Sequence, residues 1–204
     1  AGLAEGSIAL HAANSAGALA WARARGAFVR LGIAMYGVSP GAGVDHLVTG
    51  LRPVMSLHAR VSHVKRVVAG SRISYGLRHT FERDTTVATI PIGYADGVPR
   101  RLWATGGEVL IGGRRRPIVG VVTMDQLMVD CGDDAEPVRI GDEVVLIGEQ
   151  AGPDRVERIT ADDWARQLDT IGYEIVCGVG PRVPRVLRRG PSGARSLQDG
   201  MADH

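Results

Sequence analysis

Short apolar runs separated by glycine and proline turns fill residues 46–188, and this pattern limits the fold more than any other feature of the sequence. Residues 54–67 alternate apolar and polar side chains, which is the period of a half-buried strand. Residues 108–111 and 117–122 flank a turn of glycines and arginines and are typical of a hairpin. Other strand-like runs cover residues 72–75, 85–92, 127–130 and 143–148. Many short strands with frequent turns predict a mostly β, barrel-like C-terminal domain.

Two details refine this prediction. Proline has no backbone N–H to donate, so Pro91 predicts that its strand lies at an edge or contains a bulge. Thr160 with an acidic residue three positions later predicts a capped helix over residues 160–168, the one clear helix of the domain. We expect residues 173–176 and 182–187 to close the domain.

The first 45 residues follow a different pattern. Residues 8–12 and 27–37 are strand-like runs on either side of a small, helix-favouring stretch, residues 16–25, and an asparagine or serine just before that stretch can cap it. A single strand–helix–strand unit cannot cover both faces of its own parallel sheet. We therefore predict that residues 1–45 are the C-terminal remnant of an α/β (TIM-type) barrel, followed by the β-rich domain of residues 46–188.

Composition narrows the class of protein. The 204 residues suffice for one or two domains, and hydrophobic and charged contents of 45% and 23% are those of a soluble globular protein. A formal net charge of +2 gives no strong field that favours nucleic acid or membrane. With no signal peptide and no apolar run long enough to span a bilayer, we expect a cytoplasmic protein.

The ends and the cysteines carry further expectations. The chain begins at Ala1 in mid-pattern, which predicts a fragment or a processed chain, and residues 189–204 predict a disordered tail. Cys131 and Cys177 form neither a CxxC pair nor a metal-binding spacing with the six histidines. We expect both to be small buried residues in a reducing compartment, and we expect no metal site.

Two tyrosines stand where a strand-like run meets a glycine. Tyr75 and Tyr94 are either half-buried sheet residues or phenols held rigidly beside a cleft. The triplet Arg114–Arg116 is interpreted as a solvated turn, because a nucleic-acid patch would need aromatic neighbours and the chain has only two phenylalanines. Backbone N–H groups of Gly32 and Ile33, where a parallel strand would end, can cradle a phosphate.

Six motifs occur in the order found in bacterial alanine racemases, and the chain resembles that family over residues 8 to 188. The motifs are His11–Ser15, Val29–Gly37, Ile73–Gly76, Ile92–Gly97, Met124–Gln126 and Arg182–Arg185. The family has an N-terminal eight-stranded α/β barrel that holds pyridoxal 5′-phosphate, followed by a mostly β domain. The resemblance implies that this chain is the C-terminal portion, lacking most of the barrel.

The resemblance also implies a reaction. The family interconverts L-alanine and D-alanine by two-base proton transfer on a pyridoxal phosphate aldimine, and so supplies D-alanine for peptidoglycan. The two bases are the cofactor lysine and a tyrosine from the partner subunit of a homodimer, and Tyr75 matches that tyrosine. A phenol has a pKa of about 10, so it needs a cationic or hydrogen-bonding neighbour to act near pH 7.

Further residues match family positions. Ser15, Gly32 and Ile33 match the phosphate cradle. Arg30 matches the arginine that faces the pyridine nitrogen and keeps it unprotonated, because arginine offers only donors. Met124 matches the residue whose backbone N–H meets the substrate carboxylate in the partner's site.

Tyr94 matches a tyrosine at the entrance of the substrate pocket.

In two respects the chain departs from the family pattern. Pro181 stands where the family often has a tyrosine whose hydroxyl contacts the phosphate. Lys65 is the only lysine, and its strand-like surroundings give no reason for it to carry the cofactor. We therefore expect the isolated chain to be inactive.

Three alternatives stay open. A racemase of broader amino-acid specificity fits the same motifs. A non-catalytic binding or dimerisation module made of the β-rich domain would explain the missing lysine. A related decarboxylase is disfavoured, because its family carries a Cys-Asp-Gly-type motif and residues 131–134 read Cys-Gly-Asp-Asp.

Overall fold

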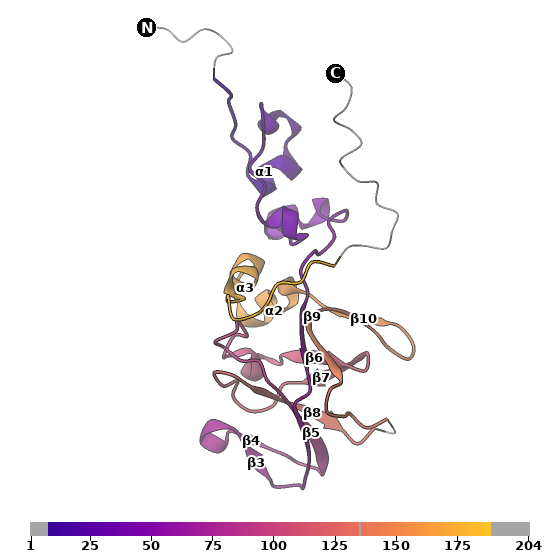
Figure 1. The fold of residues 1–204 in the computed structure, drawn as a ribbon. Helices are drawn as coiled ribbons and strands as arrows, with labels where there is room; N and C mark the ends of the chain where they lie inside the picture. Colours follow the sequence, from indigo (N-terminus) through magenta and orange to yellow (C-terminus); the bar gives the residue numbers. More distant parts are fainter. Residues whose placement is uncertain (1–7, 135, 189–204) are drawn as a thin grey trace.

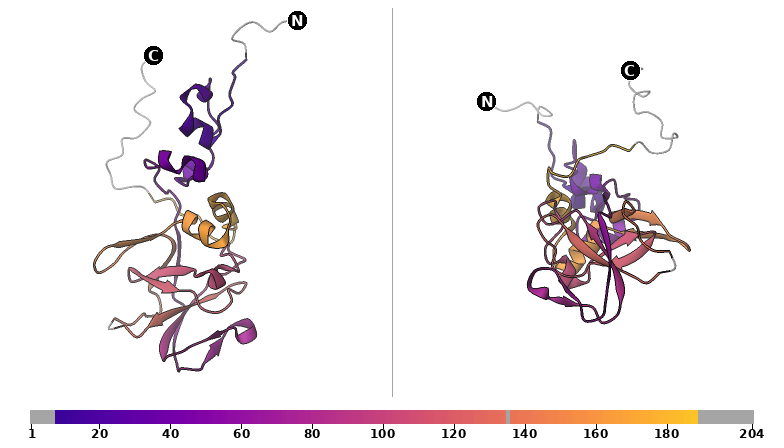
Figure 2. Two further views of the ribbon diagram at one scale, coloured as in Figure 1. Left: turned by 180° about the vertical axis from the view of Figure 1, so that it is seen from behind. Right: turned by 60° about the horizontal axis from the view of Figure 1, so that its bottom comes forward.

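The computed structural model describes residues 8–134 and 136–188. An N-terminal segment projects from one end of a β-rich domain, and two short helices lie between that segment and most of the strands (Figures 1 and 2). The N-terminal segment contains α1 (Ser15–Ala20) and the 3₁₀ helices η1 (Ala22–Arg25), η2 (Ile33–Tyr36) and η3 (Ala42–Leu47).

Antiparallel strands build the β-rich domain. Its strands are β1 (Leu57–Arg60), β2 (His63–Val67), β3 (Arg72–Ile73), β4 (His79–Thr80), β5 (Thr85–Ile90), β6 (Glu108–Ile111), β7 (Arg114–Pro117), β8 (Leu127–Gly132), β9 (Glu143–Ala151) and β10 (Val156–Ile159). Its helices are η4 (Tyr75–Leu77), η5 (Leu102–Thr105), α2 (Ala161–Leu168) and α3 (Gly172–Gly178). One sheet has the order β1-β9-β6-β7 with β10 paired to β9, a second has the order β2-β5-β8, and β3 pairs with β4.

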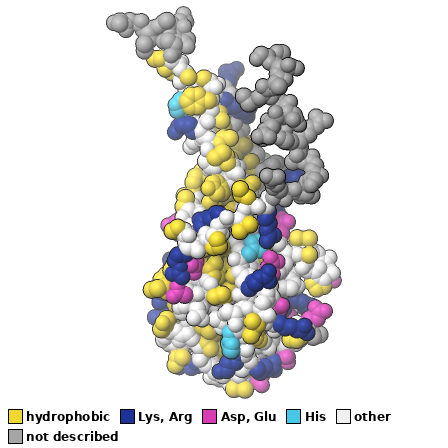
Figure 3. Space-filling model, in the orientation of Figure 1, with side chains coloured by type: hydrophobic (Ala, Val, Ile, Leu, Met, Phe, Trp, Pro, Cys, Tyr) yellow, Lys and Arg dark blue, Asp and Glu magenta, His cyan; other side chains and the backbone are white. Residues whose placement is uncertain are grey.

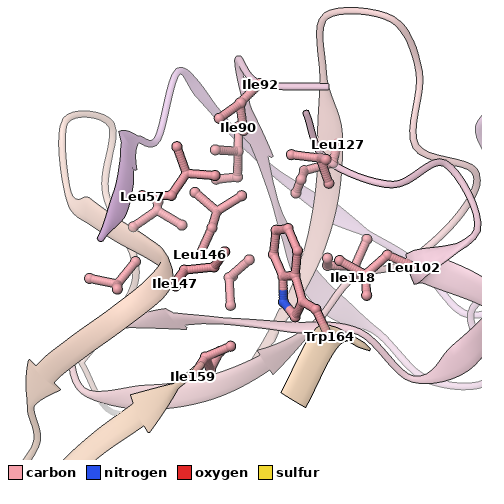
Figure 4. Close-up of a cluster of buried hydrophobic side chains, with 14 of the residues drawn as sticks. Leu57, Ile90, Ile92, Leu102, Ile118, Leu127, Leu146, Ile147, Ile159 and Trp164 are labelled. Atoms are coloured by element: carbon pink, nitrogen blue, oxygen red, sulfur yellow. The ribbon is translucent and has the colours of Figure 1, made fainter. Parts of the chain in front are cut away.

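The main core lies between the two larger sheets and α2. Leu57, Ile90, Leu146 and Trp164 are all buried and converge in the close-up of Figure 4. Trp164 comes from α2, whose start is fixed by the predicted capping box: the Thr160 hydroxyl accepts from the Asp163 N–H, and the Asp163 carboxylate accepts from the Thr160 N–H. The three antiparallel sheets confirm the predicted mostly β architecture.

The predicted strands at residues 8–12 and 27–37 are wrong. The second stretch donates only two backbone hydrogen bonds to residues 8–13, from Ala27 N–H to Leu10 C=O and from Arg30 N–H to Ala13 C=O, both 2.9 Å. Extended segments become strands only when a ladder satisfies their backbone groups. The predicted helix forms with Asn14 as its N-cap, but it is regular α-helix only as far as Ala20.

Apolar side chains gather on this N-terminal segment, as Figure 3 shows. The exposed large ones are Ile8, Leu10, Trp21, Phe28, Leu31, Met35, Tyr36 and Leu47. An exposed apolar patch rimmed by polar residues is typical of a surface that other protein covers.

The long run at residues 54–67 is divided between two sheets. Val61 is buried and its N–H donates to Asp142 C=O, whereas the Ser62 N–H donates to Thr89 C=O in the other sheet. The chain therefore changes sheets between β1 and β2. Of the two alternatives predicted from Pro91, the edge strand is wrong, because β5 lies between β2 and β8 and ends before the proline. The register of β5 against β8 does shift, between Thr86 and Val87.

The predicted hairpin forms, but its second strand starts earlier. Gly112 and Gly113 have φ of 61° and 67°, as the two central residues of a type I′ turn require. Arg114–Pro117 is the strand β7, so the arginines are not in the turn. Arg116 is only 8% exposed and hydrogen-bonds to Cys131 C=O and to the Asp134 carboxylate, which contradicts the solvated-turn interpretation.

The end of the domain differs from the prediction. Residues 173–176 belong to α3, where Ile175 and Val176 are buried against the core. Tertiary packing outweighs the weak strand preference of β-branched residues here. Cys131 is buried as expected, but Cys177, also on α3, is exposed.

Three expectations concern the rest of the chain. The predicted disordered tail lies outside the described residues. No helix within residues 8–134 and 136–188 has the length and apolar character needed to cross a membrane. Over the same residues there is no cluster of three or more histidine, cysteine or acidic side chains suited to a metal ion.

Candidate active site

Ser15 brings the N-terminal site residues together. It is buried at the start of α1, and its hydroxyl oxygen accepts from the Gly32 N–H at 3.0 Å and from the Ala34 N–H at 3.4 Å. Because the oxygen accepts both bonds, the hydroxyl hydrogen can donate to a further acceptor. Ile33 is buried and begins η2, so the cradle residues predicted from the sequence adjoin one another.

Arg30 adds a positive charge to this group. Its side chain is exposed and donates from Nη2 to Ala12 C=O at 3.1 Å. A Cβ added at Gly32 would meet nothing within 4 Å, so there is open space beside the backbone at this point. A guanidinium, a hydroxyl and backbone amides around open space suit an anionic ligand such as a phosphate.

Tyr75, Tyr94 and Met124 form a second group in the β-rich domain. Their exposed fractions are 73%, 42% and 52%. The loops of Tyr94 and Met124 are joined by bonds from the Tyr94 N–H to Thr123 C=O and from the Ala95 N–H to Met124 C=O, both 3.0 Å. All three side chains are thus presented to the surface, which excludes the half-buried sheet alternative for the two tyrosines.

Ion pairs also link these two loops: Arg182 pairs with both Asp96 and Asp125. Arg182 Nε lies 3.1 Å from Asp96 Oδ1, and its Nη2 donates to Asp125 Oδ1 at 2.6 Å. The buried Asp96 also accepts from the Gly93 N–H at 2.9 Å. The hydrogen bond to Asp125, together with the charge of Asp96, raises the pKa of Arg182. The sequence motifs predicted no role for these three side chains, although the two acids lie within two positions of Tyr94 and Met124.

Tyr75 lies far from Ser15 and Arg30 within one chain. Figure 1 places α1 toward one end of the molecule and β3, which leads into Tyr75, at the other, with the larger sheets between them. Ser15 and Arg30 therefore cannot reach Tyr75 in the same chain.

A cleft of about 760 Å³ belongs to neither group. It lies between the N-terminal segment and the β-rich domain and is lined by residues such as Val54, Ile147 and Asp162. Burial raises the pKa of Asp162 there. The two departures from the family pattern are also placed: Lys65 is exposed on β2, and Pro181 is exposed beside Arg182.

The fold and these residues define a class: a β-rich domain that follows part of an α/β barrel and carries exposed tyrosines on its surface. Residues 54–187 match the family model "Alanine racemase, C-terminal domain", and residues 1–40 match "Alanine racemase, N-terminal domain". The chain belongs to the alanine racemase family.

Curated relatives agree with this assignment. The chain is 54% identical over 175 residues to the alanine racemase of Symbiobacterium thermophilum, covering 86% of this chain and 45% of the relative. It is 50% identical over 176 residues to the alanine racemase of Thermobifida fusca, with coverages of 86% and 45%. The chain therefore spans less than half the length of these relatives.

Solved structures show the same relationship. The alanine racemase of Bacillus anthracis with bound L-Ala-P has a TM-score of 0.79 at 43% identity, covering 89% of this chain and 45% of that one. The alanine racemase of Streptomyces lavendulae has a TM-score of 0.77 at 43% identity, with coverages of 90% and 46%.

Proposed function

We propose that this chain supplies the C-terminal part of an alanine racemase, which interconverts L-alanine and D-alanine with pyridoxal 5′-phosphate in a homodimer with shared sites. The separation of Ser15 and Arg30 from Tyr75 carries the proposal, because only two copies can unite a cofactor cradle with a catalytic base. The product would serve as a peptidoglycan precursor in the cytoplasm.

The domain division belongs to the same proposal. We place residues 1–45 in the barrel domain and residues 46–188 in the β-rich domain. The exposed apolar side chains of the N-terminal segment support this, because they suit packing against more of a barrel. The two family-model matches lie on either side of this boundary.

The described residues fit the cofactor in part. The Ser15 hydroxyl and the Ile33 amide would hold its phosphate, and the Gly32 amide, which here donates to the Ser15 oxygen, would turn to the phosphate. The Arg30 guanidinium would face its ring nitrogen and keep it unprotonated. When bound, pyridoxal phosphate binds the amino group of the substrate and withdraws electrons from the Cα–H bond. Pro181 contributes no hydroxyl to the phosphate, and the lysine that would anchor the cofactor is not among these residues.

The β-rich domain would act on the substrate in the partner's site. Tyr75 would take the Cα proton of L-alanine on its phenolate oxygen and return it in the reverse reaction. The Tyr94 N–H fixes Thr123 C=O, and in a trans peptide the Met124 N–H points opposite to that carbonyl. Met124 therefore directs its N–H away from the Tyr94 loop, where it would donate to the substrate carboxylate, and the Tyr94 side chain would wall the pocket entrance.

A chimera tests the proposal. We join the upstream part of the Symbiobacterium thermophilum racemase to this chain and measure D-alanine formation, with L-serine as a second substrate to test for broader specificity. We expect racemisation by the chimera, and little or none by the 204-residue chain alone because it lacks the cofactor lysine. Robust D-alanine formation by the isolated chain would contradict the proposal. An inactive chimera that folds and binds the cofactor would favour a non-catalytic module.

Replacing Tyr75 by phenylalanine in the chimera tests the base. We expect racemisation to fall by roughly 10²–10⁴-fold, because general base catalysis typically contributes that much, while the cofactor absorbance persists. Tyr173→Phe is the matched control, since Tyr173 lies on α3. Unchanged rates in both directions for Tyr75→Phe would exclude Tyr75 as a base.

A further inference from the structure

Strained backbone surrounds Tyr75. Among the described residues only Ser74, Leu77 and Asp169 combine a side chain with a positive φ. Asp169 ends α2 in the left-handed conformation that helix ends commonly use. Ser74, with φ 63° and ψ 177°, and Leu77, with φ 48°, instead stand on either side of Tyr75. Such conformations are costly and persist only where the surroundings impose them.

Contacts from the chain that leads to Met124 impose this conformation on Ser74. The Ser74 hydroxyl donates to Val121 C=O at 2.7 Å, and the Leu77 N–H donates to Ser74 C=O at 3.0 Å. Gly120 has φ 70°, and a Cβ added there would lie 2.8 Å from the Ser74 Cβ. Only glycine at residue 120 therefore allows the two segments to approach so closely.

The side chain of Tyr75 has little packing of its own. At 73% exposure it cannot be held by its neighbours, so its direction depends on the backbone that carries it. Val121 lies three positions before Met124, so the hydrogen bond from Ser74 ties the tyrosine to the segment that presents the substrate contact.

We propose that Ser74 is a positioning residue for Tyr75: its hydroxyl bond to Val121 and its strained backbone set the direction of the phenol relative to Met124. The inference rests on the proposed racemase function. Preorganising a base in this way matters because small misplacements of reacting groups reduce rates strongly.

Hydrogen exchange in the 204-residue chain tests the structural half of the inference without cofactor or activity. We expect the Leu77 amide to exchange faster in Ser74→Ala and Ser74→Gly than in the wild type. Ser62 is the matched control, because its hydroxyl donates to Thr89 C=O at 3.0 Å in the same domain without a positive φ. Exchange at Leu77 that is unchanged in both Ser74 variants would overturn the inference.

Kinetics in the chimera test the positioning half. Ser74→Gly relieves the strain, so we expect it to unfold at no lower temperature than Ser74→Ala. We expect its kcat/KM to fall on the order of tenfold to a hundredfold. The isotope effect with Cα-deuterated L-alanine should rise more than that with deuterated D-alanine, because only the L-side proton transfer depends on Tyr75. The Ser62→Gly control should change neither kcat/KM nor the isotope effects.

The outcomes separate the two proposals. A folded but inactive wild-type chimera would refute the racemase function, and with it the positioning role of Ser74 in that reaction. An active wild-type chimera with unchanged kcat/KM and isotope effects in Ser74→Gly would refute the positioning role alone.

Discussion

At the scale of single residues, Gly93 shows how tightly the Tyr94 and Met124 loops meet. A Cβ added at Gly93 would lie 2.3 Å from the Thr123 carbonyl oxygen and 2.4 Å from that of Met124. Both contacts are with backbone, so no side chain can move aside. The absence of a side chain at this position is what allows the two loops to pair.

We therefore expect Gly93→Ala to lower the free energy of unfolding by about 1–3 kcal/mol, as overpacking does, and to weaken substrate binding in the chimera. Urea denaturation measures the first effect. Gly43→Ala is the control, because a Cβ there meets nothing within 4 Å, and it should be neutral or slightly stabilising. Equal midpoints for the two variants would contradict the described contact.

The two cysteines should differ in reactivity. Cys177 is exposed, whereas burial raises the pKa of the Cys131 thiol to about 11. At pH 8 a disulfide reagent should modify one thiol in the native chain and two after unfolding, and Cys177→Ser should abolish the native reaction. Rapid modification of Cys131 in the native chain would show that it is not buried.

The same shift predicts a pH dependence of stability. The folded pKa of Cys131 lies above the unfolded value of 9.0, so its contribution is fully present below pH 9 and is lost as the pH rises to about 11. This loss amounts to about 2–3 kcal/mol. Cys131→Val, which does not titrate, should lose less stability over that range than the wild type. Parallel pH profiles would contradict the assignment.

At the scale of elements, the turn of the β6–β7 hairpin contains two neighbouring glycines, Gly112 and Gly113, whose surroundings differ. Both have positive φ, but a Cβ on Gly113 would lie 2.1 Å from Gly152 Cα, whereas one on Gly112 meets nothing within 4 Å. Type I′ turns accept asparagine at such positions.

We expect Gly112→Asn to change the free energy of unfolding by less than about 0.5 kcal/mol and Gly113→Asn to reduce it by about 1–3 kcal/mol. Thermal unfolding of the two variants is a matched comparison, because the substitution is the same and only the neighbouring contact differs. A similar loss in both variants would mean that strain alone, and not the contact with Gly152, decides the effect.

The secondary-structure elements also show which features the local sequence predicts and which it does not. The capping box at Thr160, the Asn14 cap and the existence of the hairpin were all predictable, because each depends on residues within a few positions of one another. The helix at residues 172–178 was not, since the local pattern favours a strand and only packing of Ile175 against the core decides otherwise.

At the scale of the whole molecule, the separation of the two site groups predicts complementation. In the chimera, Tyr75→Phe and Arg30→Ala should each impair activity. A heterodimer of the two variants has one site with both defects and one with neither, so we expect it to recover about half of the wild-type activity.

The measurement uses two affinity tags and tandem purification after co-expression. The control is Tyr75→Phe carried on both tags, which should stay inactive. A heterodimer that also stays inactive would mean that each site is built within one chain, and the shared-site proposal would fail.

Six ordered motifs in the sequence identified the family and predicted the site residues, and the alternating runs determined a mostly β domain, because both depend on residue types and short spacings. Only the tertiary structure divided residues 54–67 between two sheets, buried Arg116 beside Asp134 and joined Arg182 to Asp96. It alone set β3, which leads into Tyr75, at the opposite end of the molecule from α1. These outcomes depend on contacts between distant parts of the chain, which no local pattern encodes.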